Sequence, residues 1–136
     1  MAISILDYED GTAKNRIDRN TLLTSIELQH EGKSSIVTAP VISTHELSAL
    51  AHWFEQVAIG KPAKPVVLQE PCLFFDCHQQ ILDKFRLTVR MEAEASPVWT
   101  SYYAEPLTMV FWLTYKEMLE TAQSLRQLHH NFPTQA

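Results

Sequence analysis

The chain has 136 residues, of which 46% are hydrophobic and 20% charged, and its formal net charge is -5. This length suits one domain with a full hydrophobic core, so we predict a single domain over residues 1–136. The acidic balance and the scattered basic residues argue against nucleic-acid binding, and no apolar run reaches the roughly 18 residues that a membrane-spanning helix needs.

The N-terminus and the cysteines both bear on location. Residues 1–8 contain neither the positive region nor the apolar stretch of a signal peptide, so we expect a cytoplasmic protein. Cys72 and Cys77 lie in one apolar run at an odd spacing, which predicts that they occupy opposite faces of a strand. Buried free thiols of this kind are compatible with a reducing compartment.

Strands are predicted in the first part of the chain. A short apolar stretch spans Ile3 to Leu6, and apolar and polar residues then alternate over residues 22–29. Glu31-Gly32 separates this run from a second extended run at Ser34 to Thr38, which predicts a β-hairpin. Pro40 is expected to end the extended region.

A helix is predicted next. Ser43 with Glu46 has the spacing of a capping box, and Gly60 suits the end of the helix. Between them apolar residues recur at spacings of three and four, which predicts one apolar stripe that packs on a sheet. The stripe consists of Leu47, Leu50, Ala51, Phe54, Val57 and Ala58.

The second half repeats the order of strands followed by a helix. Residues 66–69 and 72–75 appear extended, and strict alternation over residues 85–93 predicts a strand with one buried and one solvated face. Residues 107–113 are a further strand. Thr114 with Glu117 forms a second capping box before the last helix.

This order predicts an α+β fold. We expect a single antiparallel β-sheet of about six strands with two α-helices packed on one face, in the order βββ-α-βββ-α.

The residues that usually carry chemistry are not grouped in the sequence. His45 and His52 are seven residues apart, whereas zinc ligands on adjacent helical turns normally sit three or four apart. The chain contains no Gly-x-Ser-x-Gly nucleophile motif, and its three glycines are isolated from one another. We therefore expect no enzyme activity, no cofactor and no metal.

Binding residues are easier to suggest. Trp99, Tyr102 and Tyr103 lie in the loop Ser96 to Pro106, where aromatic side chains can anchor a protein interface. The alternative is that these rings fold back over the sheet or the edge of the core.

A charged sheet face is the second candidate surface. The residues predicted to form it are Arg86, Arg90, Glu92, Glu27 and Glu94. A merely solvated face is the alternative reading of this group.

The ordered combination of these features resembles a known family. A helix with the sequence Leu47-Ser-Ala-Leu-Ala-His-Trp-Phe54 is followed by Glu70-Pro-Cys-Leu-Phe-Phe75, the alternating strand, Trp99 and a final helix closing at Asn131-Phe-Pro133. This layout is similar to that of the bacterial WapI-type immunity proteins over roughly residues 20–133. The segment Met1 to Arg19 carries little of the likeness.

The resemblance implies a cytoplasmic partner of a cognate toxin domain, which it would neutralise by occlusion. One alternative is a small-ligand-binding protein or an enzyme with a cleft between sheet and helices, using His52, His78 or Asp76. Another is a structural subunit or homo-oligomer, in which Val110 and Trp112 form a self-complementary patch if their side of the strand is uncovered.

Overall fold

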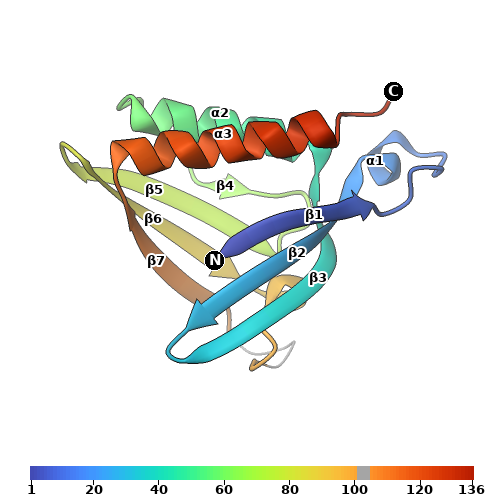
Figure 1. Ribbon diagram of the computed structural model, residues 1–136, viewed down its shortest axis with the longest axis horizontal. Coiled ribbons are helices and arrows are strands. Elements are labelled where there is room, and N and C mark those ends of the chain that lie inside the picture. The colour runs from blue at the N-terminus through green and yellow to red at the C-terminus, as the bar shows by residue number, and fades with distance from the viewer. Residues whose placement is uncertain (101–104) are drawn as a thin grey trace.

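The protein folds into two antiparallel sheets and a pair of long helices. The computed structural model describes residues 1–100 and 105–136, and in that part of the chain β1–β2–β3 form one sheet and β4–β5–β6–β7 the other. The sheets diverge like the sides of a wedge, and α2 and α3 lie side by side across its wide end (Figure 1). The elements in chain order are β1 (Ala2–Tyr8), α1 (Arg16–Arg19), β2 (Thr21–His30), β3 (Lys33–Ser43), α2 (Thr44–Ala58), β4 (Val66–Val67), β5 (Leu73–Ile81), β6 (Lys84–Met91), a 3-10 turn (Ala93–Ala95), β7 (Leu107–Leu113) and α3 (Tyr115–Asn131).

The α+β class is confirmed, but the predicted single sheet of about six strands is wrong. β3 ends at Ser43, and a separate sheet begins at β4 after α2. The 3-10 turn packs against β3, and the Val98 amide donates a hydrogen bond to Ser35 Oγ of that strand (2.9 Å). A loop therefore lies along the edge of β3. The two sheets would be joined only if a strand paired with β3 at that place. Alternation in the sequence assigns the two faces of a strand, but it does not determine which strands pair.

The β2–β3 hairpin is confirmed, and β3 is longer than predicted. Its two-residue turn, Glu31-Gly32, has positive φ at both residues (50° and 76°), which matches the twist of the flanking strands. Pro40 does not end the strand. The register shifts between the pairs Leu22–Ile42 and Thr24–Ala39, so β3 carries one extra residue there. Such a bulge tolerates the proline that a regular ladder would exclude.

Both predicted helix starts are confirmed. Ser43 Oγ accepts a hydrogen bond from the Glu46 amide (3.3 Å), and Glu46 Oε1 accepts one from the Ser43 amide (2.9 Å). Thr114 and Glu117 form the same reciprocal pair at the start of α3. The two helices pack against each other, and Arg126 of α3 pairs with Glu55 of α2.

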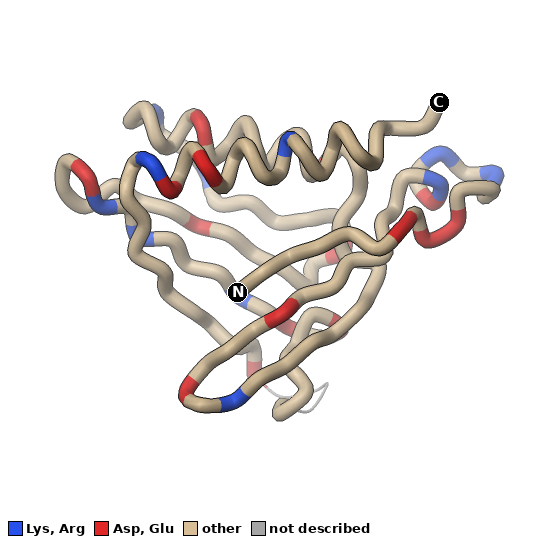
Figure 2. Tube along the Cα trace, in the orientation of Figure 1, with Lys and Arg blue, Asp and Glu red and all other residues tan. Residues whose placement is uncertain are grey.

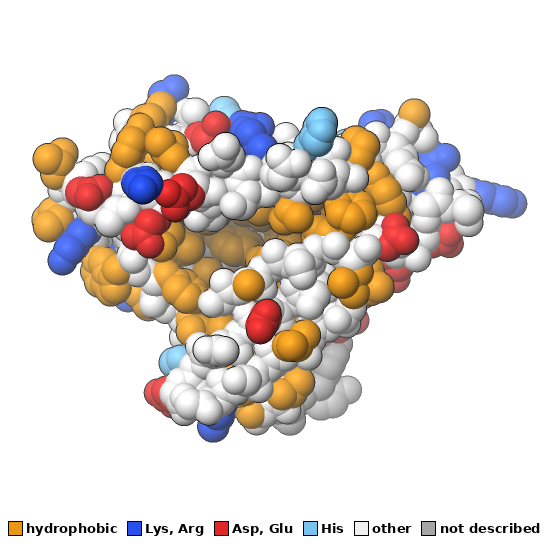
Figure 3. Space-filling view, viewed as in Figure 1, with side chains coloured by type: hydrophobic (Ala, Val, Ile, Leu, Met, Phe, Trp, Pro, Cys, Tyr) orange, Lys and Arg blue, Asp and Glu red, His pale blue; other side chains and the backbone are white. Residues whose placement is uncertain are grey.

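The hydrophobic core fills the inside of the wedge. Inward-facing side chains of β2, β5 and β6 and of both long helices are almost completely buried, whereas those of β1 and β7 remain partly exposed. Figure 3 shows the result as a hollow lined by hydrophobic side chains between α3 and the strands below it. The largest fully buried side chains are Phe85, Leu22, Ile26, Leu28, Ile42, Leu47, Leu50, Leu73, Met91, Met118, Val41 and Val89.

The N-terminal segment is joined to the last residues of the chain. Asn20 is 1% exposed, and its side-chain amide donates hydrogen bonds to the carbonyls of Arg16 (2.9 Å) and Gln135 (3.0 Å). Its Oδ1 accepts a third hydrogen bond from the Gln135 amide (2.6 Å). Tyr8 also donates to the Pro133 carbonyl. β1, α1 and the C-terminal tail are therefore held together by polar contacts that periodicity does not reveal.

The two cysteines are both buried free thiols. The prediction that they occupy opposite faces of a strand is wrong, because β5 begins at Leu73 and Cys72 lies in the turn before it. Cys77 faces inward from the strand. Burial, reinforced by the Asp76 carboxylate, raises the pKa of the Cys77 thiol to about 11. Burial likewise raises the pKa of Cys72. Both thiols are therefore poor nucleophiles near neutral pH.

Candidate functional site

The four-stranded sheet has one face that neither long helix covers, because both lie on the inner side of the wedge (Figure 1). Strand register sorts the side chains of this face into three rows that cross β5, β6 and β7. The first row is Phe74–Arg90–Thr108, extended by Val67 of β4; the second is Asp76–Thr88–Val110; the third is His78–Arg86–Trp112. We call these side chains, together with Lys84 of β6, the outer face.

Aromatic and apolar side chains on the outer face are unusually exposed. Trp112 is 56% exposed, Val110 40% and Val67 61%. Aromatic residues and arginine are enriched at protein interfaces relative to the rest of the surface, whereas an ordinary solvated sheet face is mostly polar. The outer face therefore adds residue types that are enriched at interfaces, Trp112, Arg86 and Arg90, to an otherwise largely polar sheet face.

The charge of the outer face is opposite to that of the whole chain. Lys84, Arg86 and Arg90 follow one another along β6, where Figure 2 shows blue segments of the chain. Asp76 is the one carboxylate in the three rows. The whole chain has a formal net charge of -5, so the positive charge along β6 is a local departure from the overall charge.

Two contacts organise the charged groups of β5 and β6. The Arg90 guanidinium lies 4.4 Å from the centroid of the Phe74 ring, a cation–π contact. His78 Nε2 lies 3.1 Å from Asp76 Oδ2. Within the described part of the chain, neither Arg86 nor Arg90 forms a salt bridge. Arg86 is exposed and available to a partner, whereas Arg90 is half-buried and its Nε is buried without a hydrogen-bond partner.

The residues predicted for partner binding are placed in different environments. Arg86 and Arg90 both lie on the outer face, and Glu92 is half-buried just beyond the end of β6, where its amide donates to the Cys72 carbonyl (3.0 Å). Trp99 is half-buried against the core, with Lys33 Nζ 6.0 Å from its ring centroid. Tyr102 and Tyr103 fall outside the described residues.

The charged face predicted from alternation is only partly assembled. Glu27 belongs to β2, in the other sheet, and Glu94 lies in the 3-10 turn. Both therefore lie outside the rows that contain Arg86 and Arg90. The prediction of one sheet groups these carboxylates with the guanidinium groups, whereas the fold keeps them apart.

Some residues of the outer face were missed as binding candidates. Lys84, Phe74 and Val67 were not singled out, although the same alternation that exposes Arg86 also exposes Lys84. The sequence suggests Trp112 and Val110 for self-association, on the condition that their side of the last strand is uncovered. It is uncovered, and register places both beside the β6 cations.

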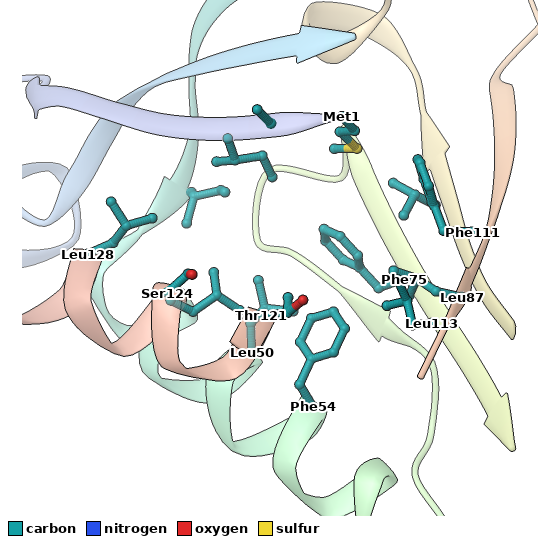
Figure 4. Close-up of a pocket in the computed structure, with 15 residues that line it drawn as sticks. Met1, Leu50, Phe54, Phe75, Leu87, Phe111, Leu113, Thr121, Ser124 and Leu128 are labelled. Atoms are coloured by element: carbon teal, nitrogen blue, oxygen red, sulfur yellow. The ribbon is translucent and has the colours of Figure 1, made fainter. Parts of the chain in front are cut away.

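A cleft is present between the sheets and α3, as the ligand-binding alternative requires. It has a volume of about 380 Å³ and lies between β1 and β7. Figure 4 shows Phe54, Phe75 and Phe111 projecting into it, with Thr121 and Ser124 on the α3 side. None of its described lining side chains is titratable.

The polar groups suggested for that alternative are elsewhere. His52 is exposed on α2, and His78 with Asp76 lies on the outer face. The three side chains therefore do not converge on the cleft. Among the described residues, no three His, Cys, Asp or Glu side chains are grouped so that they could hold a metal ion. Of the helices described, none combines the length and hydropathy of a membrane span.

The chain matches a family of known proteins. No curated protein and no solved structure matches the chain significantly. The model of the family described as "Immunity protein WapI-like family" matches residues 1–133. The match begins at residue 1, so the segment Met1 to Arg19, which carries little of the sequence resemblance, lies within the family region, in agreement with the pairing of β1 with β2. With nearly its whole length matched, the chain belongs to the WapI-like immunity protein family.

Proposed function

We propose that this protein is a cytoplasmic immunity protein that binds a cognate bacterial toxin domain through the outer face and neutralises it by occlusion. The observation that carries the proposal is a sheet face that combines exposed aromatic and aliphatic side chains with a row of cations on an acidic protein. Family membership supports the immunity role, and the outer face supplies a place for the contact.

Occlusion needs a complementary surface and no reactive group. Hot spots of protein interfaces are enriched in tryptophan and arginine and cluster near the centre of the contact. Trp112 and Arg86 are direct cross-strand neighbours, so one contact could bury both. The surrounding side chains of the three rows then exclude water from that pair.

Charge complementarity indicates which part of the partner lies there. Lys84, Arg86 and Arg90 attract an acidic region, and charged groups across an interface mainly set specificity and the rate of association. We therefore expect carboxylates on the toxin surface that meets β6. Binding of such a surface should weaken as the salt concentration rises.

The test is a charge reversal at two exposed positions, K84E together with R86E. Lys14→Glu with Lys61→Glu is the matched control, because both of those lysines are also exposed and the double change lowers the net charge equally. The binding partner to be measured is the toxin domain expected to be encoded by a neighbouring gene, and the readouts are calorimetry and protection of growing cells.

We expect the β6 double variant to lose at least tenfold in affinity and to fail to protect cells, whereas the control binds within about twofold of the native protein. Equal affinities for the two double variants would remove the outer face from the proposal. Native protein that neither binds nor protects against that toxin would refute the immunity role itself.

A further inference from the structure

β7 is an outermost strand with no protection against pairing. In the described part of the chain no strand pairs with its outer edge. Its sequence, Leu107–Leu113, contains no charge, proline or glycine, and its register with β6 is continuous. Proteins usually blunt such edges with charges, prolines, bulges or very short strands, because a free row of amides and carbonyls invites another strand.

The other edges are protected in these ways. β1 has an irregular register between Ile5 and Asp7, and Asp7 places a charge on it. β4 is only two residues long. The edge of β3 is packed against the 3-10 turn. β7 therefore differs from every other sheet edge that the structure describes.

The inner side of β7 borders an unfilled apolar space. Its inward-facing side chains remain partly buried, whereas Phe85 and Val89 of the neighbouring strand are 0% and 1% exposed. The cleft of about 380 Å³ begins at Phe111 and Leu113, extends to Ile3 of β1 and is roofed by α3 (Figures 3 and 4). A strand added to β7 would direct every second side chain into this cleft.

We propose that β7 accepts an extended segment of the partner protein as an added strand, in which apolar side chains alternate with acidic ones. This inference rests on the proposed function and describes how the partner is held. The apolar side chains enter the cleft, and the acidic ones lie on the outer face. Backbone hydrogen bonds to β7 supply affinity, while the alternating side chains supply specificity.

The acidic half of the pattern follows from the β6 cations. An added strand would lie two strand spacings from β6, roughly 10 Å. Arg86 is exposed and forms no salt bridge among the described residues. Its side chain and a glutamate on the added strand can together span the intervening strand.

A second copy of this chain fits this place less well. The β7 of a second copy contains no carboxylate that could pair with Arg86. In addition, the second copy would bring its own β6 alongside its β7. That strand would then meet β1 and α3 of the first copy, which already form the far side of the cleft. A single extended segment meets neither difficulty.

A peptide titration followed by NMR tests the inference. The probe is an end-blocked peptide of about seven residues that alternates valine and glutamate, roughly the length of β7. Its control is a peptide of the same composition with the valines grouped at one end. We expect the alternating peptide to bind at least tenfold more tightly and to protect alternate β7 amides from hydrogen exchange.

Variants test the charge component separately. Arg86→Gln should weaken binding of the alternating peptide several-fold while leaving the β7 protection pattern intact, and the exposed Lys61→Gln should have no effect. Absence of peptide binding, or binding without protection of β7 amides, would overturn the inference. So would β7 protection that appears without peptide and increases with protein concentration, since the edge would then pair with a second copy.

The two proposals fail in different ways. If K84E with R86E abolishes toxin binding but the peptide leaves β7 unaffected, the immunity role stands and strand addition is wrong. If the native protein does not recognise the toxin at all, the proposed function fails whatever the peptide does.

Discussion

Replacing Trp112 by alanine should weaken toxin binding strongly and leave the fold almost unchanged. The side chain is 56% exposed in the free protein. A tryptophan buries up to about 250 Å², so complete coverage of the exposed part removes roughly 140 Å² from water. At about 25 cal/mol per Å² this area corresponds to about 3.5 kcal/mol. Incomplete coverage reduces the value, and we expect a loss of about 2 to 3.5 kcal/mol, or roughly 30- to 300-fold in Kd.

Calorimetric titration of the toxin domain measures this loss. Ile36→Ala is the control, because Ile36 is 63% exposed on β3 of the other sheet. Its removal should change Kd by less than about twofold, and both variants should keep the native melting temperature within a few degrees. The reasoning is refuted if Trp112→Ala is folded and binds the toxin within twofold of the native protein.

Three further predictions concern stability and the buried thiols. Asn20→Ala removes three side-chain hydrogen bonds and should lower the free energy of unfolding by about 3 kcal/mol in urea titrations; a loss below about 1 kcal/mol would show that the contact to Gln135 is dispensable. Ser43→Ala removes a helix cap and should cost about 1 kcal/mol by the same measurement, whereas no change would mean that solvent replaces the cap. With its pKa raised to about 11 from an ordinary 9.0, Cys77 keeps its proton longer in the folded state than in the unfolded state, so stability should fall as pH rises from about 9 to 11. A Cys77→Ala variant should lose that part of the pH dependence, and an identical alkaline profile would contradict the assignment.

The secondary structure could be predicted from the sequence wherever local rules decide it. The two capping boxes fix the starts of α2 and α3, and the alternation from Phe85 to Met91 fixes both the strand and its buried face. The prediction that Pro40 ends the strand is wrong because a bulge in β3 accommodates the proline, and a bulge depends on the partner strand. The division into two sheets could not be predicted, since it depends on the loop that packs beside β3.

In the candidate site, too, local sequence rules identify some residues, and only the pairing of distant strands reveals the others. Alternation identified Arg86 and Arg90 as outward-facing, and the structure confirms that orientation. Their neighbours Phe74 and Trp112 come from other strands, so only the register reveals that they share a face. For Trp99 the sequence leaves open an interface anchor or a ring folded over the core, and the structure shows it packed against the core, through contacts that are distant in sequence.

Every strand described pairs only with strands adjacent to it along the chain, and this order has a consequence for folding kinetics. The β2–β3 and β5–β6 hairpins close two-residue turns, so these two strand pairs can form early at a small entropic cost, whereas the connections from β1 to β2 and from β6 to β7 are longer. We therefore expect the docking of α2 against α3, which brings the two halves of the chain together, to be a late step. Substitutions between these helices should mainly accelerate unfolding, whereas substitutions in the β2–β3 and β5–β6 turns should slow refolding.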